Sequence, residues 1–490
     1  MMTIFSRYRH RWIVFVLLLV MVRLLSGCFL FPPVNPPDKT DSFAPTLEWV
    51  SPTFGAVMDV FPVGNIVSIG DRTRSDGRIF IGIQTFSPEG QQLDYSEDAG
   101  LSKEVVANFT GIYNRNIVSH VSTNNSPNYI TLSSLSYTNP YTRYNTYRGA
   151  PDTKPYPYSG YVEVVGPSIA KATPERTYIY PPRNDASQVA SIWMVGTFCD
   201  NFQSFPEYFE FGDPNRGKIL FNHLCPTFGK ADCFVLRNDP KPDAITHPVR
   251  HQWGGPENDL AYDVASDDIG NATIFLRAGS DFGITSATQS LVRMKTGYNI
   301  VRLDTNGLLT ETFPVSLEAA GELTDTQIAL GNSGAIYILA KDEVKKQYFL
   351  AKVSRSGTAW TRYLPTTVSN RENSIPVSRD ARMGLTVDSK DCAYITGNFS
   401  GTVDFGGASL TSSGVQVFVA KYSASSTCLG ALAMGSGLGV TVRLSPDEKS
   451  LYVNGWAVES IMGTAIPDQN DERNGVLRPG AFLVKLKLTK

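Results

Sequence analysis

The chain has 490 residues, and its 44 Lys and Arg against 46 Asp and Glu give a formal net charge of -2 at pH 7. This near balance argues against a nucleic-acid-binding protein, which carries a basic excess or a basic face. A hydrophobic content of 42% is too high for a disordered chain and allows a large core. The 41 Gly and 30 Pro, together with 22 Tyr and 26 Phe, favour strands and hairpins over helices.

Residues 1–27 have the features of a secretory signal peptide. Three arginines within the first 11 residues precede an uncharged apolar run of 11 residues, Trp12 to Val22. This run is shorter than the roughly 20 residues that a transmembrane helix needs. It fits the hydrophobic region of a signal sequence, so we expect export. An ordinary signal peptide or a signal anchor remains the alternative to a lipoprotein signal.

The tetrapeptide Leu25-Ser-Gly-Cys28 at the end of this segment resembles the lipobox of bacterial lipoproteins. In that family the cysteine is acylated and becomes the first residue of the mature chain. The resemblance makes Cys28 the lipid attachment site, and several acyl chains hold a protein durably at a membrane. Phe29 stands where an Asp retains enterobacterial lipoproteins in the inner membrane. The resemblance therefore implies the outer membrane, on its periplasmic or cell-surface face.

Residues 28–45 form a short polar segment that is rich in proline. Such a segment is extended, at about 3.1 Å per residue where it adopts polyproline II geometry. We interpret it as a tether between the lipid and a folded domain at residues 46–490.

Repeats along the rest of the chain indicate the fold. One phrase, a polar turn followed by a β-rich run around an aromatic residue, is clearest at residues 388–397 and 446–455. Related versions lie at residues 331–340 and 268–275. The aromatic residues that mark the copies are Phe80, Tyr129, Trp193, Phe275, Tyr337, Tyr394 and Tyr452.

A second phrase follows each clear copy, with large apolar residues and a basic residue near its end. It occurs at residues 233–237, 299–303, 348–353, 417–422 and 481–486. A run with an aromatic residue after a small turn, as at Gly357-Thr-Ala-Trp360, comes next, and a short apolar run precedes each copy. Four strands per unit and seven units predict an all-β chain folded as a β-propeller with seven four-stranded blades.

The two ends of the chain complement each other in this scheme. The last unit ends at Lys490, directly after its third strand, and Leu47-Glu-Trp49-Val50 resembles the Trp-bearing strand that it lacks. We therefore expect the N-terminal strand to close the last blade. Two or three stacked β-sandwiches are the alternative, because they contain similar short strands.

Residues 384–435 carry the motif Tyr394-Ile-Thr-Gly-Asn-Phe-Ser-Gly-Thr-Val-Asp-Phe405 and then Phe-Val-Ala-Lys-Tyr422. This segment resembles the bacterial SBBP-type β-propeller repeat. Trp253-Gly-Gly255, followed by Asp259, is similar to the junction between two such repeats. The resemblance implies a propeller in an exported bacterial protein, in a family whose activities are mostly undefined. It carries no catalytic residues to this chain.

Cysteines are expected to pair in an oxidising compartment. Their grouping predicts one disulfide between Cys392 and Cys428, and a second from Cys199 to either Cys225 or Cys233. A zinc site formed by these last three cysteines and a histidine is the alternative, but their spacing matches no compact zinc module. We predict no metal and no cofactor.

The chain shows no nucleophile elbow, phosphate-binding loop, HExxH motif or EF-hand loop. Several carboxylates lie in equivalent turns, which indicates a role in turn geometry, because a catalytic pair would occur once. These turn residues are Asp267, Asp268, Asp388, Asp391 and Asp447. We therefore predict no catalytic residues.

The segment 137–161 contains seven tyrosines and is not explained by the repeat. Its prolines argue against a regular central strand. Tyrosine offers rigid amphipathic contact area that suits protein or glycan surfaces, whereas packing on its own blade is the alternative. The partner-binding candidates are Tyr141, Tyr144, Tyr147, Tyr156 and Tyr158.

These observations favour a lipid-anchored, exported propeller that serves as a non-catalytic binding or assembly module of the bacterial cell envelope. Its partner would be an envelope protein or a glycan. One alternative is an extracytoplasmic propeller enzyme that acts on polysaccharide or peptidoglycan. Another is a passive structural lipoprotein.

Overall fold

The structure is a computed structural model, and the part of the chain that it describes begins at residue 42. It describes residues 42–53, 55, 57–60, 64–73, 79–101, 105–113, 116–123, 126–134, 142–144, 168–170, 192–199, 210–211, 219–220, 228, 231–238, 249–267, 271–285, 291–304, 306–319, 322–365, 368–369, 383–467, 469–471, 476–478 and 480–488. For most strands before residue 231 it describes the backbone alone. The predicted signal peptide, Cys28 and the tether up to residue 41 lie outside these residues.

From Phe43 on, the described residues belong to one unit, Phe43–Thr489, and their strands pair antiparallel. No helix that could cross a membrane occurs in the described ranges. Five sheets have four strands each, which are named below from the innermost strand outward. They are β2 (Val57–Val60), β3 (Ile66–Thr73), β4 (Ile79–Phe86) and β5 (Gln92–Leu101); β6 (Val105–Tyr113), β7 (Asn116–Thr123), β8 (Ser126–Ser134) and β9 (Thr142–Tyr144); β10 (Ser168–Ala170), β11 (Ile192–Cys199), β14 (Ala231–Asn238) and β15 (Val249–Trp253); β16 (Leu260–Ser266), β17 (Ala272–Ala278), β20 (Gly297–Leu303) and β21 (Leu309–Val315); and β22 (Leu323–Leu330), β23 (Ile336–Asp342), β24 (Gln347–Ser354) and β25 (Gly357–Tyr363).

The remaining large sheet has nine strands. They are β26 (Val368–Ser369), β27 (Gly384–Val387), β28 (Ala393–Asp404), β29 (Ser409–Tyr422), β30 (Cys428–Leu444), β31 (Ser450–Ile461), β32 (Thr464–Ala465), β35 (Gly480–Lys487) and β1 (Thr46–Thr53). Two-stranded hairpins add β12 (Glu210–Phe211) with β13 (Ile219–Leu220), β18 (Phe282–Thr285) with β19 (Leu291–Met294), and β33 (Gln469–Asp471) with β34 (Val476–Arg478).

The long strand β30 makes the nine-stranded sheet continuous. Its first part pairs with β29, and its second part pairs with β31. Gly437 lies where the pairing changes, and a Cβ atom there would meet the backbone oxygen of Trp456 at 2.0 Å, so the close approach requires glycine. One half of β30 is thus the outer strand of β27–β28–β29, and the other half is the inner strand of β31–β35–β1.

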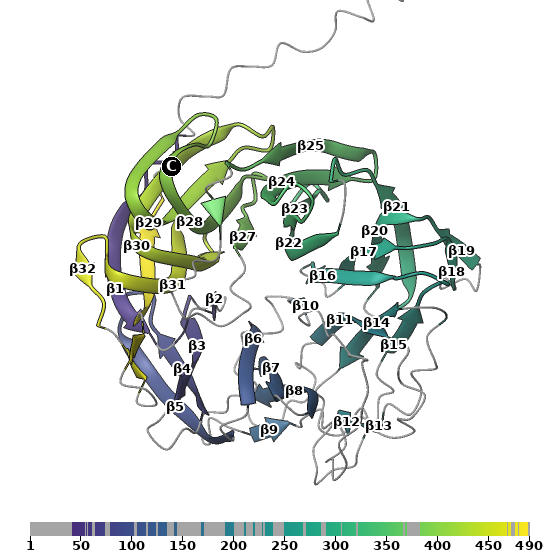
Figure 1. The fold of residues 1–490 in the computed structure, drawn as a ribbon, viewed down its shortest axis with the longest axis horizontal. Helices are drawn as coiled ribbons and strands as arrows, with labels where there is room; N and C mark the ends of the chain where they lie inside the picture. The colour runs from purple at the N-terminus through teal and green to yellow at the C-terminus, as the bar shows by residue number, and fades with distance from the viewer. Residues whose placement is uncertain are drawn as a thin grey trace, which may run out of the picture. The chain divides into compact units, whose positions relative to one another are not determined.

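Contacts between the innermost strands join the sheets into a ring (Figure 1). In turn, β2 contacts β6, β6 contacts β10, β10 contacts β16, β16 contacts β22, β22 contacts β27, β27 contacts β30, and β30 contacts β2. This arrangement confirms the prediction of an all-β propeller. The number of blades, seven, stays a prediction, because hydrogen bonds along β30 join the last nine strands into one continuous sheet.

The N-terminal strand closes the last sheet, as expected from its sequence. Strand β1 pairs antiparallel with β35, and Trp49 lies opposite Lys485. The Trp49 ring lies 6.1 Å from the Tyr452 ring, and its Nε1 donates a hydrogen bond of 3.1 Å to the Pro88 carbonyl. Because Pro88 belongs to the turn after β4, Trp49 connects the C-terminal sheet to the first one.

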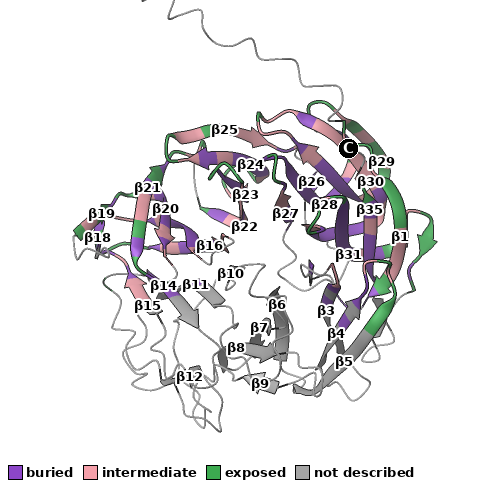
Figure 2. Ribbon diagram, turned by 180° about the vertical axis from the view of Figure 1, so that it is seen from behind, coloured by how far each residue is buried: buried purple, intermediate pink, exposed green. Residues whose placement is uncertain are grey.

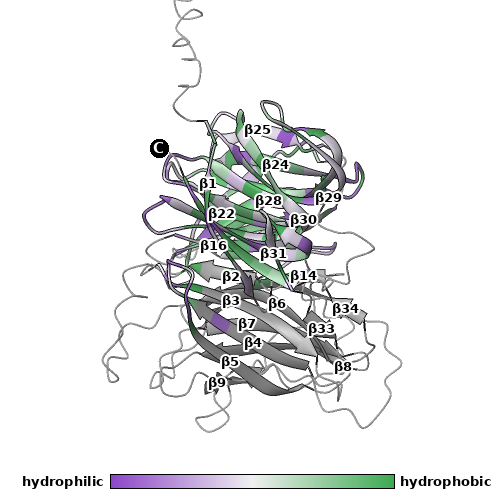
Figure 3. Cartoon of the chain, turned by 90° about the vertical axis from the view of Figure 1, so that its left-hand side faces the viewer, coloured by the Kyte–Doolittle hydropathy of each residue, from purple (hydrophilic) through white to green (hydrophobic). Residues whose placement is uncertain are grey.

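The hydrophobic core lies between adjacent sheets. In β23, β24 and β28, buried residues occupy both faces of the strand over most of its length (Figure 2). Hydrophobic residues accordingly run along the strands, as on β28 and β31 (Figure 3). One cluster combines Phe275 and Ile300 with Ile338 and Phe349, and so joins the sheet β16–β21 to the sheet β22–β25.

For two of the aromatic residues that marked the repeats, the predicted strand of the blade is wrong. Tyr337, Tyr394 and Tyr452 each lie on the second strand of a four-stranded unit, as predicted. Phe80 and Tyr129 lie instead on β4 and β8, the third strands of their sheets. Second and third strands are both apolar runs bounded by turns, so the weak copies were assigned to the wrong one.

The predicted disulfide between Cys392 and Cys428 is wrong. Both residues are buried thiols. Cys392 precedes β28 and Cys428 begins β30, and β29 pairs between these two strands. Two strand spacings amount to about 10 Å, beyond the roughly 7 Å that a disulfide spans.

The predicted bridge from Cys199 to Cys233 is also wrong, since Cys233 is a buried thiol that lies opposite Thr197. The other option, Cys199 with Cys225, lies outside the described residues, because only the backbone of Cys199 is described.

Replacement of Trp49 by Ala should lower the free energy of unfolding by about 2 kcal/mol, because a half-buried ring and its contact with Tyr452 are lost. Urea unfolding of the purified chain measures the change. Leu47→Ala on the same strand is the matched control and should change stability by less than about 1 kcal/mol, since Leu47 is exposed. Equal effects of the two substitutions would contradict the assigned role of Trp49 in closing the ring.

The cysteine assignment predicts that Cys392 and Cys428 react with a maleimide once the chain is unfolded, without prior reduction. Peptide mass spectrometry should find both residues labelled, even in protein recovered from an oxidising compartment. Labelling that requires a reductant at both positions would show a disulfide and refute the assignment.

Candidate functional site

A repeated side-chain cluster connects neighbouring sheets. In its most complete form, Tyr337 on β23 lies opposite Lys352 on β24, which in turn lies opposite Trp360 on β25. The Lys352 ammonium is 5.4 Å from the centroid of the Tyr337 ring, and the two aromatic rings are 6.0 Å apart. We call this arrangement the Tyr–Lys–aromatic cluster.

The cluster reaches across to the next sheet. The Tyr337 hydroxyl donates to the backbone carbonyl of Asp391 at 2.5 Å, and Lys352 Nζ lies 3.4 Å from the Asp391 carboxylate. Trp360 Nε1 donates to the Ala424 carbonyl at 3.0 Å. Each member of the cluster therefore contributes a contact between two sheets.

Two further interfaces contain the same cluster. Tyr452, Lys485 and Trp49 form it around β31, with the ammonium 5.9 Å from the tyrosine ring. Tyr394 and Lys421 form it around β28, at 5.2 Å. There the aromatic member is Phe43, whose ring lies 5.9 Å from that of Tyr394 and whose backbone passes close to a glycine of β30.

The electrostatics of the cluster keep its hydroxyl groups protonated. Burial raises the pKa of Tyr337, Tyr394 and Tyr452 well above the usual value for tyrosine. Burial opposes ionisation of Asp391, but hydrogen bonds from Ser333 and the nearby Lys352 outweigh it and lower the Asp391 pKa. The tyrosines thus remain hydrogen-bond donors, and the aspartate remains an acceptor.

One interface departs from this pattern. On the sheet β16–β21, Thr273 lies opposite Arg302, where the three units that follow it place tyrosine opposite lysine. Glu311 on β21 lies opposite Arg302 in the position that Trp360 holds on β25. The large aromatic rings of the cluster are therefore absent from these two positions, and hydrophilic side chains replace them.

The facing turn of the next sheet is altered in the same way. Gly334 and Asp391 are each the fourth residue of a five-residue turn that a backbone hydrogen bond closes, with φ of 76° and 62°. Glycine therefore stands where the neighbouring interface has its aspartate. Arg355 lies in the turn between β24 and β25, where the next sheet has Ala424.

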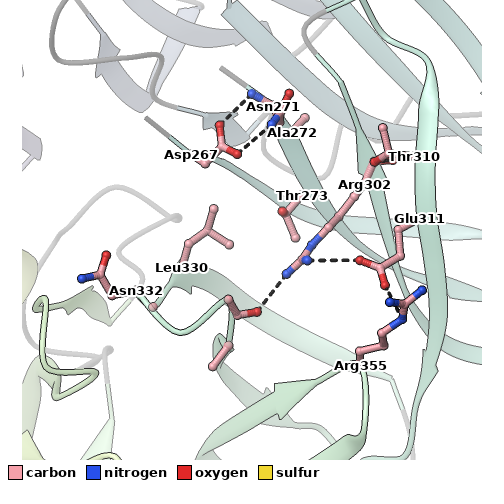
Figure 4. A pocket seen from close by; sticks show the side chains of 13 residues that line it. Asp267, Asn271, Ala272, Thr273, Arg302, Thr310, Glu311, Leu330, Asn332 and Arg355 are labelled. Atoms are coloured by element: carbon pink, nitrogen blue, oxygen red, sulfur yellow. Dashed lines mark hydrogen bonds and ion pairs between the residues drawn. The ribbon is translucent and has the colours of Figure 1, made fainter. Parts of the chain in front are cut away.

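These replacements leave a pocket of about 620 Å³ between the two sheets (Figure 4). Its wall is formed by β17, β20 and β21 on one side and by the end of β22 and the following turn on the other. The lining residues are Asp267, Asn271, Ala272, Thr273, Arg302, Thr310, Glu311, Leu330, Gly331, Asn332, Gly334, Ala335 and Arg355.

Arg302 is the centre of the pocket. Its Nη1 donates to Glu311 Oε2 at 3.1 Å, and its Nη2 donates to the Gly334 carbonyl at 2.9 Å (Figure 4). Gly334 holds the same turn position as Asp391, whose carbonyl accepts the hydrogen bond from the Tyr337 hydroxyl in the neighbouring interface. Arg302 thus replaces both the lysine and the tyrosine hydroxyl as the link between sheets.

A second arginine and two further polar groups complete the lining. Arg355 Nε lies 2.8 Å from Glu311 Oε1, and the Arg355 side chain is 84% exposed. Asp267 accepts hydrogen bonds from the backbone and side-chain nitrogen atoms of Asn271. The pocket therefore offers fixed donors and acceptors in a partly open space, which suits the binding of a polar ligand.

The tyrosines that the sequence predicts to bind a partner are hardly covered by the described residues. Tyr141, Tyr147, Tyr156 and Tyr158 are outside the described residues, and Tyr144 is described only as backbone on the edge strand β9. The role of this segment stays a prediction.

The aspartates expected in turns are where they were predicted. Asp267, Asp388, Asp391 and Asp447 belong to turns between the first and second strands of their units. Asp268 is outside the described residues. In the described part of the chain, no three His, Cys, Asp or Glu side chains come together as a metal site.

The pocket itself was missed by the sequence reasoning. The signal that could have revealed it is the repeat, because Thr273 and Glu311 stand where other copies have tyrosine and tryptophan. The repeat pattern in the sequence aligns Phe275 with Tyr337, although the cross-strand pairing shows that Thr273 is the equivalent residue.

No protein-family model and no curated protein sequence matches the chain. Solved structures resemble it at a low level. The BBS1N domain in complex with ARL6DN has 10% identity and a TM-score of 0.37, over 91% of this chain and 97% of that one. The polysaccharide lyase Uly1 has 9% identity and a TM-score of 0.42, over 89% and 90%. The WD40 domain of SCAP from fission yeast has 8% identity and a TM-score of 0.37, over 90% and 98%.

Exchanging the equivalent residues Tyr337 and Thr273 between the two interfaces should change the stability of the chain in different ways. Tyr337→Thr should lower the free energy of unfolding by about 3 kcal/mol, because it removes a fully buried ring and its hydrogen bond. Thr273→Tyr should leave the melting temperature unchanged or raise it, since the ring enters the existing pocket. Calorimetry of both variants measures this, and a large loss of stability in Thr273→Tyr would show that the pocket cannot hold the ring.

Proposed function

We propose that this chain is an exported β-propeller, anchored to the outer membrane by a lipid on Cys28, that acts as a non-catalytic binding module of the bacterial cell envelope. The observation that carries the binding role is the pocket around Arg302. Among the four units from β16 to β35 and β1, it is the one in which polar side chains replace the Tyr–Lys–aromatic cluster. A departure from a stabilising repeat at one place indicates a site kept for another purpose.

The geometry favours binding over catalysis. Both carboxylates in the pocket already have partners, since Glu311 contacts two arginines and Asp267 accepts from Asn271. Held in this way, the side chains form a rigid set of donors and acceptors. Such preorganisation reduces the entropy lost on binding.

Sequence features support the anchored and exported location. The apolar run, the lipobox-like residues up to Cys28 and the proline-rich segment follow in the order expected for a lipoprotein. Phe43 donates its backbone N–H to the Leu429 carbonyl, so the chain contacts the propeller within the last three residues of the predicted tether, 28–45.

Crosslinking in cells, followed by capture and mass spectrometry, tests localisation and recognition separately. The native chain should capture an envelope component from the membrane fraction. Thr273→Tyr should remain in the membrane fraction and lose that component, because the ring fills the pocket. Cys28→Ser should leave the membrane fraction. Thr411→Tyr makes the same change at an exposed position of β29 and should behave as the native chain.

Capture of the same components by the native chain and by Thr273→Tyr would refute the pocket as the binding site. The competing hypothesis, an enzyme that acts on polysaccharide or peptidoglycan, predicts chain-shortened products when the purified protein is incubated with these polymers. Such products, lost in Glu311→Gln, would replace the binding function with a catalytic one.

A further inference from the structure

The lining of the pocket also indicates the chemical class of its ligand, an inference that rests on the binding function proposed above. We infer that the pocket binds an acidic saccharide, with a sugar carboxylate on Arg355 and sugar hydroxyls on the polar groups around Arg302. Three properties of the pocket support this ligand class: the charge at its mouth, the donors and acceptors of its lining, and its size.

The exposed Arg355 at the mouth favours an anion. Arg302, Glu311 and Arg355 form one connected group, and Asp267 adds a second carboxylate to the lining, so the four charges cancel and the preference for an anion comes from the position of Arg355. Arg302 is committed to Glu311 and to the Gly334 carbonyl. Arg355 contacts Glu311 through Nε, so its terminal nitrogen atoms remain for a ligand. A guanidinium group presents two parallel donors that match the two oxygens of a carboxylate.

The rest of the lining favours hydroxyl groups. Thr273 and Thr310 contribute hydroxyls, and Asn332 contributes an amide. Thr310 and Asn332 already donate to the carbonyls of Arg302 and Ser389, so they offer their oxygen atoms as acceptors for sugar hydroxyls. None of the 13 residues that line the pocket is aromatic, so the pocket offers no face for stacking a planar apolar ligand. Recognition would therefore depend on hydrogen bonds and charge.

The size of the pocket favours a saccharide over a peptide. Its volume of about 620 Å³ lies within the range of roughly 300–1,000 Å³ that is usual for small-molecule sites. An extended acidic peptide would instead use a long groove or the edge of a sheet. The pocket lies between two sheets and three of their turns and is partly open, so it can hold one or two sugar units of a longer polymer.

Isothermal titration calorimetry of the purified full chain tests this inference with a matched pair of ligands. Tetragalacturonate should bind, and its methyl ester, which has the same hydroxyls but no charge, should bind at least about tenfold more weakly. Arg355→Ala should weaken binding of the acid by about tenfold and leave binding of the ester unchanged. Arg355→Lys keeps the charge but loses the planar pair of donors, and should give an intermediate loss.

Arg293→Ala is the matched control, because Arg293 is also an exposed arginine beside a carboxylate, on the hairpin β18–β19. It should bind tetragalacturonate as the native chain does. Equal binding of acid and ester would overturn the inference in favour of a neutral sugar. Tighter binding of tetraglutamate than of tetragalacturonate would overturn it in favour of an acidic peptide.

The outcomes for this ligand and for the proposed function can be separated. If neither tetragalacturonate nor an N-acetylated uronic-acid tetrasaccharide binds, while capture in cells still depends on Thr273, the ligand class is wrong and the binding function stands. If capture does not depend on Thr273, the binding function itself fails.

Discussion

The contact of a buried tyrosine with the lysine opposite it, and of both with the next sheet, is the interaction on which the ring depends. Tyr337, Lys352 and Trp360 show it most completely. A propeller has no single core, so each sheet must be held by its two neighbours. The same contact recurs around Tyr394 and Tyr452, and the repeats visible in the sequence reflect this shared requirement.

The pocket shows how one interface can do without that contact. Arg302 supplies both links that its neighbours divide between lysine and tyrosine, since it bonds Glu311 on its own sheet and the Gly334 carbonyl on the next. Replacement of buried rings by a partly exposed ion pair loses hydrophobic stabilisation, because such pairs contribute about 1 kcal/mol or less. The clusters around Tyr337, Tyr394 and Tyr452 stabilise the neighbouring interfaces, so the ring can tolerate the proposed binding pocket at this one.

The fold could be predicted from the sequence because several copies of the same strand pattern indicate it together. The second phrase marks the third strand of each sheet at residues 233–237, 299–303, 348–353, 417–422 and 481–486, and Trp49 marks the closing strand. The pocket could not be predicted in this way, because its signal is a residue that is missing from a pattern. Recognising Thr273 as the equivalent of Tyr337 requires the cross-strand register of β17 and β20, which the nearby Phe275 obscured.

The disulfide prediction failed for a related reason. Two cysteines that are close in sequence were separated by an intervening strand.

The strand that closes the ring also follows the predicted anchor, and this placement separates the two tasks of the molecule. Trp49 fills the position of a fourth-strand tryptophan against Tyr452, so β1 cannot leave without exposing that interface. The proposed tether would join the lipid to this firmly held strand. The pocket is built from β17, β20, β21 and the turn after β22, none of which pairs with β1. The proposed anchor and the proposed binding site therefore use different sheets, and a change at Arg302 would alter binding while the attachment through β1 remains intact.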